Sequence, residues 1–259
     1  MTNKRILILA DLHCGHKAGL TDPSRVPEAA YPNVAALARE TWCEYASLPE
    51  RLGPIHAVVV NGDAIDGKGG KSGGTELLTA DRAVQVDMAE ECLQIWKPTA
   101  GFHFTYGTPY HTGEAEDWEG VLAKRMSAPI HSHLWLDVDG YIIDCKHKCG
   151  GSAIPHGRAT AAMREALWSM LWADADRQPK SNAIVRSHCH FALAVKTPRQ
   201  QIFRTPALQA ADTKYGARQC SGLVDWGVMW LDINSLGKLA NWGWYIVACE
   251  SENAKAVKI

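Results

Sequence analysis

Carboxylate and imidazole side chains follow three separate apolar runs of the sequence. The residues are Asp11 and His13 after the first run, Asp63 after the second, and His188 and His190 after a later one. In an open α/β sheet the active site lies at the carboxyl ends of the strands, so these side chains are expected to converge. Such ligands suit two neighbouring divalent metals, and a metal pair suits the hydrolysis of phosphate esters.

Further histidines lie between these groups. His111 closes the segment Gly107-Thr108-Pro109-Tyr110-His111, which follows a short apolar run. His131, His133, His147 and His156 lie between this segment and His188. His147 is the preferred ligand because it follows an apolar segment and precedes a glycine pair, and His156 is the alternative.

The apolar periodicity predicts an alternation of strands and helices. Strands are expected over 5–10, 57–60, 102–106, 183–186, 191–196, 201–205, 226–233 and 242–249, with a hairpin over 134–144 that turns at Asp139-Gly140. Helices are expected over 34–52, 81–96, 118–126 and 158–175. The first helix is expected to kink or end at Pro49. Thr79 or Asp81 is expected to cap the second helix.

This order of elements predicts an α/β protein. The expected architecture is a four-layer α/β/β/α sandwich, in which two mixed β-sheets are flanked by helices. The chain has 259 residues, of which 46% are hydrophobic and 21% charged, which favours a single domain over 1–259.

Charge and hydropathy exclude some classes of partner. The formal net charge is -1, so no bulk positive field attracts long nucleic acid. No run of 18 apolar residues is present, so we expect no membrane partner. The first apolar run is too short for the core of a signal peptide, and the eight cysteines are expected to be reduced thiols of a cytoplasmic protein.

The ordered motifs are more specific than any one of them. Asp-x-His, Gly-Asp, Gly-x-x-x-His, a lone His and His-x-His follow one another between residues 5 and 196. This order resembles the calcineurin-like metallophosphoesterases. The segment 11–20 is also similar to the opening of phage and prophage members of that family.

The resemblance implies a dinuclear metal-dependent hydrolase with a defined role for each residue. It implies a first metal held by Asp11, His13 and His190, a bridging Asp63, a second metal held by His147 and His188, and a proton delivered to the leaving oxygen by His111. A metal-bound hydroxide would attack phosphorus. Mn²⁺ is the metal expected first, with Zn²⁺, Fe and Mg²⁺ as alternatives.

Two departures from the family pattern stand out. Ser187 occupies the place of a glycine, and the asparagine that binds the second metal in the family is absent. Tyr110 instead comes directly before His111, so Thr108 or a water is expected to fill the gap.

Substrate contacts are expected from residues near these motifs. Arg158 would hold phosphate with two hydrogen bonds, or else is a surface arginine at a helix start. His156 and Tyr110 are the other substrate-binding candidates, Tyr110 as a platform for bases. Asp66 would orient a ligand histidine, or else is a solvated loop acid.

The expected substrates are phosphorylated small molecules, nucleotides or short nucleic acid, and the expected reaction is phosphodiester hydrolysis. The alternatives are a phosphomonoesterase or protein phosphatase, and a non-catalytic binding module on the same fold. No obligatory protein partner is expected.

Overall fold

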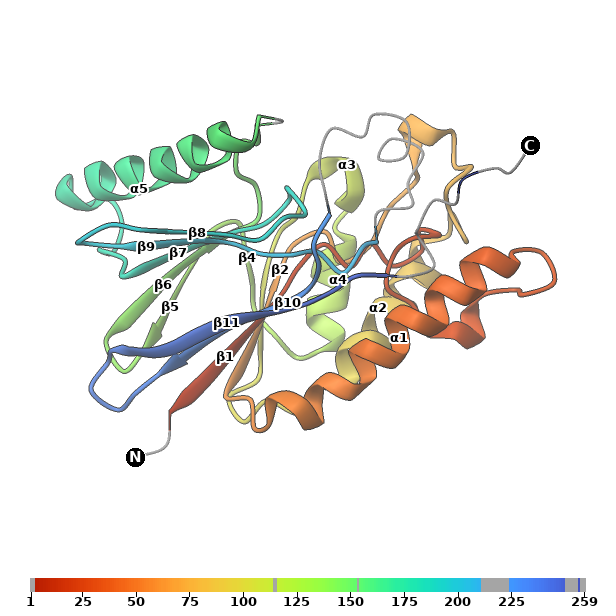
Figure 1. Ribbon diagram of the computed structural model, residues 1–259, viewed down its shortest axis with the longest axis horizontal. Coiled ribbons are helices and arrows are strands. Elements are labelled where there is room, and N and C mark those ends of the chain that lie inside the picture. Colours follow the sequence, from red (N-terminus) through yellow and green to blue (C-terminus); the bar gives the residue numbers. More distant parts are fainter. Residues whose placement is uncertain (1–2, 114–115, 153, 211–223, 250–255, 257–259) are drawn as a thin grey trace.

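Two mixed β-sheets pack face to face, and helices cover the outer face of each (Figure 1). The computed structural model describes residues 3–113, 116–152, 154–210, 224–249 and 256. The four-layer α/β/β/α sandwich expected from the order of elements is confirmed.

The first sheet has the strand order β11-β10-β1-β2-β3-β4. Its strands are β1 (Lys4–Leu9), β2 (Ala57–Asn61), β3 (Phe102–Thr105), β4 (Ile130–His131), β10 (Trp226–Ile233) and β11 (Leu239–Val247). Strands β1 to β4 are parallel, and β10 runs antiparallel to both β1 and β11. The carboxyl ends of β1, β2 and β3 therefore lie at one edge of this sheet.

The second sheet has the strand order β5-β6-β7-β9-β8. Its strands are β5 (Leu134–Val138), β6 (Tyr141–Lys146), β7 (Ala183–Arg186), β8 (Leu193–Lys196) and β9 (Gln201–Arg204). Strands β6, β7 and β9 are parallel, whereas β5 and β8 are antiparallel edges. The hairpin between β5 and β6 turns at Asp139-Gly140, where both residues have positive φ (53° and 87°), as a type I′ turn requires.

Successive side chains of β1 pack alternately against the two layers on either side of the first sheet. Ile6 and Ile8 face the second sheet, while Leu7 and Leu9 face the helices. The helices on this outer face are α1 (Pro32–Leu52), α2 (Arg82–Gln94) and α4 (Trp118–Arg125). The remaining helical segments are η1 (Pro23–Arg25), η2 (Gly70–Ser72), α3 (Pro109–Thr112), η3 (Pro155–Gly157) and α5 (Arg158–Asp174).

The structure shows where α1 ends and which residue caps α2. Of the two outcomes expected at Pro49, a kink or an end, the end is wrong, because α1 continues to Leu52 and is capped at Gly53, whose N–H donates to the Pro49 carbonyl (3.2 Å). Asp81 is the cap of α2, since its carboxylate accepts a hydrogen bond from the Ala83 N–H (2.9 Å).

Helix α5 covers the outer face of the second sheet with its small residues. Ala162 and Ala166 pack against Ile184 and Ile202. The large side chains at Met163, Leu167 and Leu171, whose spacing indicated the helix, are on the opposite face and exposed.

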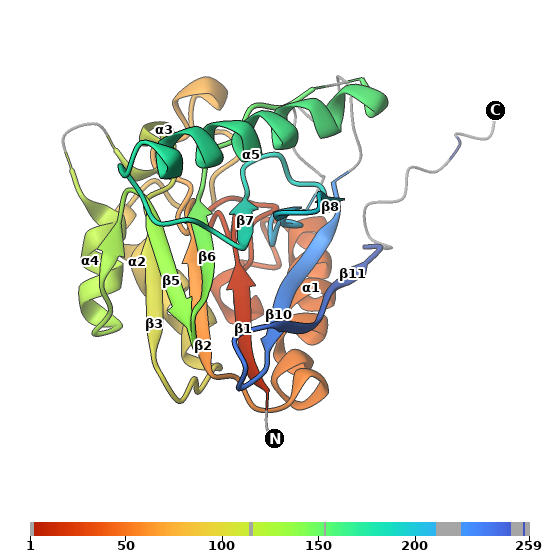
Figure 2. The same ribbon diagram turned by 90° about the vertical axis from the view of Figure 1, so that its left-hand side faces the viewer.

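Strands from both sheets point toward the same end of the molecule. Figure 2 shows the arrowheads of β1, β6 and β7 at that end. The loops that follow these strands carry the candidate ligands. Among the described residues, no helix combines the length and apolar character needed to cross a bilayer.

Candidate metal centre

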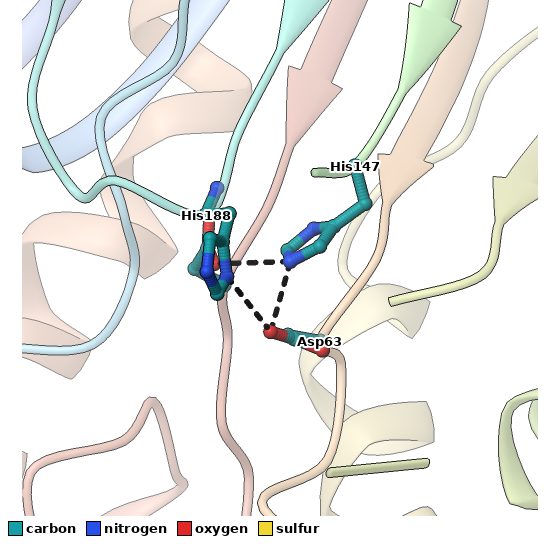
Figure 3. A group of neighbouring side chains, drawn as sticks. Asp63, His147 and His188 are labelled. Carbon is teal, nitrogen blue, oxygen red and sulfur yellow. Dashed lines mark hydrogen bonds and ion pairs between the residues drawn. The ribbon is translucent and has the colours of Figure 1, made fainter. Parts of the chain in front are cut away.

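Side chains from four strand ends meet between the two sheets. Asp11 follows β1, Asp63 follows β2, His147 follows β6 and His188 follows β7. One ligand atom from each lies within 4.8 Å of the others, an arrangement that could hold a metal ion. Asp63, His147 and His188 point toward a common space in Figure 3.

A second group adjoins the first. Asp11, His13 and His190 could hold another ion, and His190 Nε2 lies 3.2 Å from Asp11 Oδ1. Asp11 belongs to both groups, so a carboxylate lies between the two positions. The structure thus brings together all six side chains predicted as ligands and divides them nearly as the sequence motifs imply. The residue shared by these two groups is Asp11, whereas the resemblance implied Asp63 as the bridge; Asp63 is shared between the first group and a third, formed with His13 and His111.

The backbone at these positions is unusual. Eight non-glycine residues have positive φ within the described ranges. Five of them are candidate ligands, namely Asp11, His13, Asp63, His188 and His190, with φ between 47° and 72°. The left-handed region is unfavourable for residues with a Cβ, and such strain gathers at functional sites. The strained loops turn these side chains sharply out of the strand direction and into the common space.

Hydrogen bonds fix the tautomers of two buried histidines. His13 Nδ1 lies 2.9 Å from Asp66 Oδ1, and His147 Nδ1 lies 2.7 Å from the Asn61 carbonyl. In each ring Nδ1 therefore donates its proton, so Nε2 is the atom that would bind a metal. Of the two roles considered for Asp66, the buried position against His13 favours orientation of a ligand.

The atoms that face the common space lack hydrogen-bond partners. Asp11 Oδ1, His13 Nε2 and His147 Nε2 are buried, and none has a partner among the described residues. Although His147 Nε2 lies 2.9 Å from Asp63 Oδ2, the pair does not have hydrogen-bond geometry. Unsatisfied buried polar atoms are costly, and several aimed at one point fit a cation that would satisfy them together.

The protonation of the two buried histidines differs. Burial and the nearby charge of His111 lower the pKa of His13 to about 4, which keeps its ring neutral at pH 7. Burial lowers the pKa of His147, but the charges of Asp63 and Asp11 outweigh it and raise the pKa to about 10. A cation bound at His147 would therefore displace a proton.

His111 lies at the edge of the cluster, on the short helix α3. Its Nδ1 lies 2.8 Å from the Asp66 carbonyl, and its ring centroid lies 4.4 Å from that of His13. Burial lowers its pKa, but hydrogen bonding to Asp66 and the Asp63 charge raise it overall to about 9. His111 also forms a potential ligand group with His13 and Asp63, so its geometry fits either proton transfer or metal binding.

Thr108 lies against Asp63 in the segment where the family's asparagine is absent. Its N–H donates to Asp63 Oδ1 (2.6 Å), and its hydroxyl lies 3.2 and 3.3 Å from the two carboxylate oxygens. The expectation that Thr108 fills this gap agrees with the position of its side chain. Ser187, the other departure, accepts a hydrogen bond from Asn61 Nδ2 (2.6 Å) and so ties the end of β2 to the end of β7.

Glu119 is a buried residue of the site that the sequence motifs did not indicate. It lies on α4 and is 1% exposed. Its two oxygens accept hydrogen bonds from the N–H groups of Ala64 (2.9 Å) and Gly107 (2.7 Å). These residues adjoin Asp63 and Thr108, so Glu119 holds the loops after β2 and β3 together. Burial and the Asp63 charge raise its pKa to about 7.

The three predicted substrate-binding residues lie outside the ligand groups. The Arg158 guanidinium stacks over the ring of Phe191, next to His190, at 4.4 Å, and its Nε has no partner in the described chain. Tyr110 is partly exposed, and its hydroxyl accepts a hydrogen bond from the Lys71 N–H (2.6 Å). His156 is exposed in η3 and belongs to none of the ligand groups, so the geometry favours His147 as the lone-histidine ligand.

Comparison with known proteins finds similarity among solved structures only. No family model matches the chain, and no curated protein matches it. An archaeal phosphodiesterase is 11% identical, with a TM-score of 0.49, over 94% of this chain and 99% of that one. Vps29 in complex with zinc, from Entamoeba histolytica, is 14% identical, with a TM-score of 0.46, over 94% and 98%.

A predicted phosphoesterase from Streptococcus pneumoniae is 10% identical, with a TM-score of 0.40, over 95% of this chain and 99% of that one. Two of these structures are described as a phosphodiesterase and a predicted phosphoesterase, the kinds of protein that the motifs resemble. The narrower similarity to phage members receives no support. At these identities the comparisons say nothing about the reaction of this chain.

Proposed function

We propose that this protein is a metal-dependent phosphoesterase that binds two divalent cations and hydrolyses phosphodiesters of nucleotides or short nucleic acid. The observation that carries the proposal is the pair of adjoining ligand groups, with three unsatisfied buried ligand atoms aimed between them. Carboxylate and imidazole donors in this mixture suit Mn²⁺, Zn²⁺ or Fe, and Mn²⁺ is the cation we propose first.

Each ligand group would hold one cation. Asp11, His13 and His190 would hold the first, and Asp63, His147 and His188 the second, with Asp11 and Asp63 between them. Bound divalent cations would supply Lewis-acid polarisation of the phosphoryl oxygens and would lower the pKa of a water.

His111 is the proposed donor to the leaving oxygen. Its raised pKa keeps the ring protonated at neutral pH, and its Nδ1 is anchored on the Asp66 carbonyl. Nε2 is thereby left to carry the proton that an alkoxide leaving group requires. Asp66 acts as a positioning residue, since it contacts both His111 and His13.

Arg158 is the proposed contact for a phosphoryl oxygen. Its guanidinium lies over the ring of Phe191, the residue that follows His190, and so is placed beside the loop of His188 and His190. The Arg204 guanidinium lies over the same ring (5.0 Å), so two arginines adjoin the proposed metal pair. We propose a diester first, with a phosphomonoester or a phosphoprotein as the alternatives that the substrate panel separates from it.

A substrate panel with added Mn²⁺ tests the proposal. Bis(p-nitrophenyl) phosphate, p-nitrophenyl phosphate and a phosphopeptide would be compared at equal concentration, with Asp63→Asn as the inactive control. The proposal expects the highest kcat/KM on the diester. Higher activity on the monoester or the phosphopeptide would replace it with a phosphatase, and no turnover on any substrate would favour a non-catalytic binding module.

A further inference from the structure

Helix α5 carries an exposed apolar surface on the side that does not pack on the second sheet, and Trp168 and Trp172 at its margin also line a pocket with Lys146 of β6. Five large side chains form the apolar surface, with exposures between 41% and 53%: Met163, Leu167, Trp168, Leu171 and Trp172. We call these residues the α5 surface. In Figure 1, α5 forms the outermost layer over β7, β8 and β9, and no other described element covers its outer side.

The distribution of residue sizes on α5 is the reverse of that in an ordinary surface helix. Its inner face is made of Ala162, Ala166 and Ser169. The large apolar side chains, which contribute most to burial, are left in solvent. They expose roughly 500 Å² of apolar area, and continuous patches of this size mark interaction sites. If two copies covered each other's surface, they would together bury about 1,000 Å². This is about the smallest total buried area found in specific protein interfaces.

Charges at the two ends of α5 indicate what would cover this surface. The first turn has no acidic residue and the last turn no basic one. Arg164 lies in the second turn and Asp174 is the last residue, both exposed and without an ion-pair partner among the described residues. The negative charge of Asp174 opposes the preference of the helix macrodipole at a C-terminus, so it does not stabilise the helix in isolation.

An antiparallel second copy would pair these charges. Positions 164 and 174 are equidistant from position 169, and so are positions 167 and 171. A two-fold axis at the level of Ser169 would therefore set Arg164 against Asp174 of the other copy, and Leu167 against Leu171. A parallel arrangement would oppose like charges. In a two-fold interface each residue i that contacts residue j of the other copy is matched by j contacting i, and the pairs 164/174 and 167/171 meet this requirement.

We propose that the α5 surface is a homodimer interface, in which two copies of this chain pack their α5 helices antiparallel around the level of Ser169. The proposal does not depend on the phosphoesterase activity, because none of the candidate metal ligands lies on α5 and Arg158, its first residue, is not part of the α5 surface. It implies that the apolar side chains stay covered in the working protein.

Sedimentation equilibrium of the full chain over a wide concentration range tests this interface. The wild type is expected to have twice the mass of one chain. Leu167→Glu should weaken dimerisation at least roughly tenfold, because it buries a charge in the centre of the interface. Leu236→Glu, at a position 70% exposed outside this surface, is the matched control and should have no effect. Circular dichroism checks that each variant is folded.

A charge exchange tests the antiparallel arrangement. Arg164→Glu alone and Asp174→Arg alone should each weaken the dimer several-fold, because like charges then meet twice across the axis. The double variant should recover the wild-type dissociation constant to within about twofold.

Three results would overturn the proposal. The first is a wild type that stays monomeric at about 100 μM, well above the dissociation constants of specific dimers. The second is a dimer that survives Leu167→Glu or is not restored by the double variant. The third is a monomer that instead sediments with anionic vesicles through Leu167, which would assign the surface to a membrane.

Discussion

Glu119→Gln is the substitution whose effect on stability can be derived most directly from the structure. The Glu119 carboxylate accepts two backbone N–H bonds that join the loops carrying Asp63 and Thr108. The amide of glutamine offers only one acceptor, so one of the two N–H groups would face another donor. The variant also removes the ionisation of this buried side chain.

The raised pKa of Glu119 gives the magnitude and sign of its pH dependence. The pKa moves from 4.5 to about 7 because the side chain is buried and lies near the Asp63 charge. Between these values the folded chain keeps the proton while the unfolded chain releases it. The stability contributed by the protonated form is therefore fully present below pH 4.5 and lost as pH rises through 7. A shift of this size corresponds to about 3 kcal/mol.

Urea unfolding in the presence of EDTA, from pH 4.5 to pH 8, measures this effect. The free energy of unfolding of the wild type should fall by about 3 kcal/mol relative to Glu119→Gln over that range. Glu50→Gln, at an exposed glutamate, is the matched control and should track the wild type. Parallel pH profiles for the wild type and Glu119→Gln would refute the reasoning.

Three further predictions concern the proposed metal centre. Asp63→Asn should abolish hydrolysis while circular dichroism stays unchanged, and retained turnover would exclude a bridging role. His111→Ala should slow alkyl phosphodiesters more than p-nitrophenyl esters, because p-nitrophenolate needs little protonation; equal losses in kcat would argue against proton donation by His111. Asp66→Ala should weaken Mn²⁺ binding about 10- to 100-fold in calorimetry, because His13 loses its orienting partner. An unchanged Mn²⁺ affinity would show that Asp66 does not orient His13 for metal binding.

The fold and the convergence of the candidate ligands could be predicted because both depend on local signals. Apolar runs marked the strands, and the polar residues directly after them marked the strand ends. The Asp139-Gly140 pair fixed the hairpin through backbone conformations that few other residues accept. Strand ends in parallel sheets share an edge, so Asp11 and Asp63 had to approach each other once β1 and β2 were paired.

The remaining features depend on how segments distant in the sequence approach one another. Glu119 lies on a short polar helix and has no motif around it, and its role arises only because α4 packs beneath two loops. Thr108 could be proposed from the sequence as a substitute for the missing asparagine, but its position could not be predicted. Its contact with Asp63 depends on the conformation of the loop after β3. The orientation of α5 was not predicted either, because periodicity identifies an apolar face without saying whether the sheet covers it.

The most direct test of the central claim is the number of Mn²⁺ ions that the full chain binds. Isothermal titration of the metal-free protein, checked by elemental analysis after gel filtration, measures it independently of any substrate. The adjoining ligand groups predict close to two ions per chain in the wild type, with Asp11→Asn and Asp63→Asn each losing at least one. Absence of binding in the wild type, or full binding in both variants, would contradict the assignment of this cluster as a dinuclear metal centre.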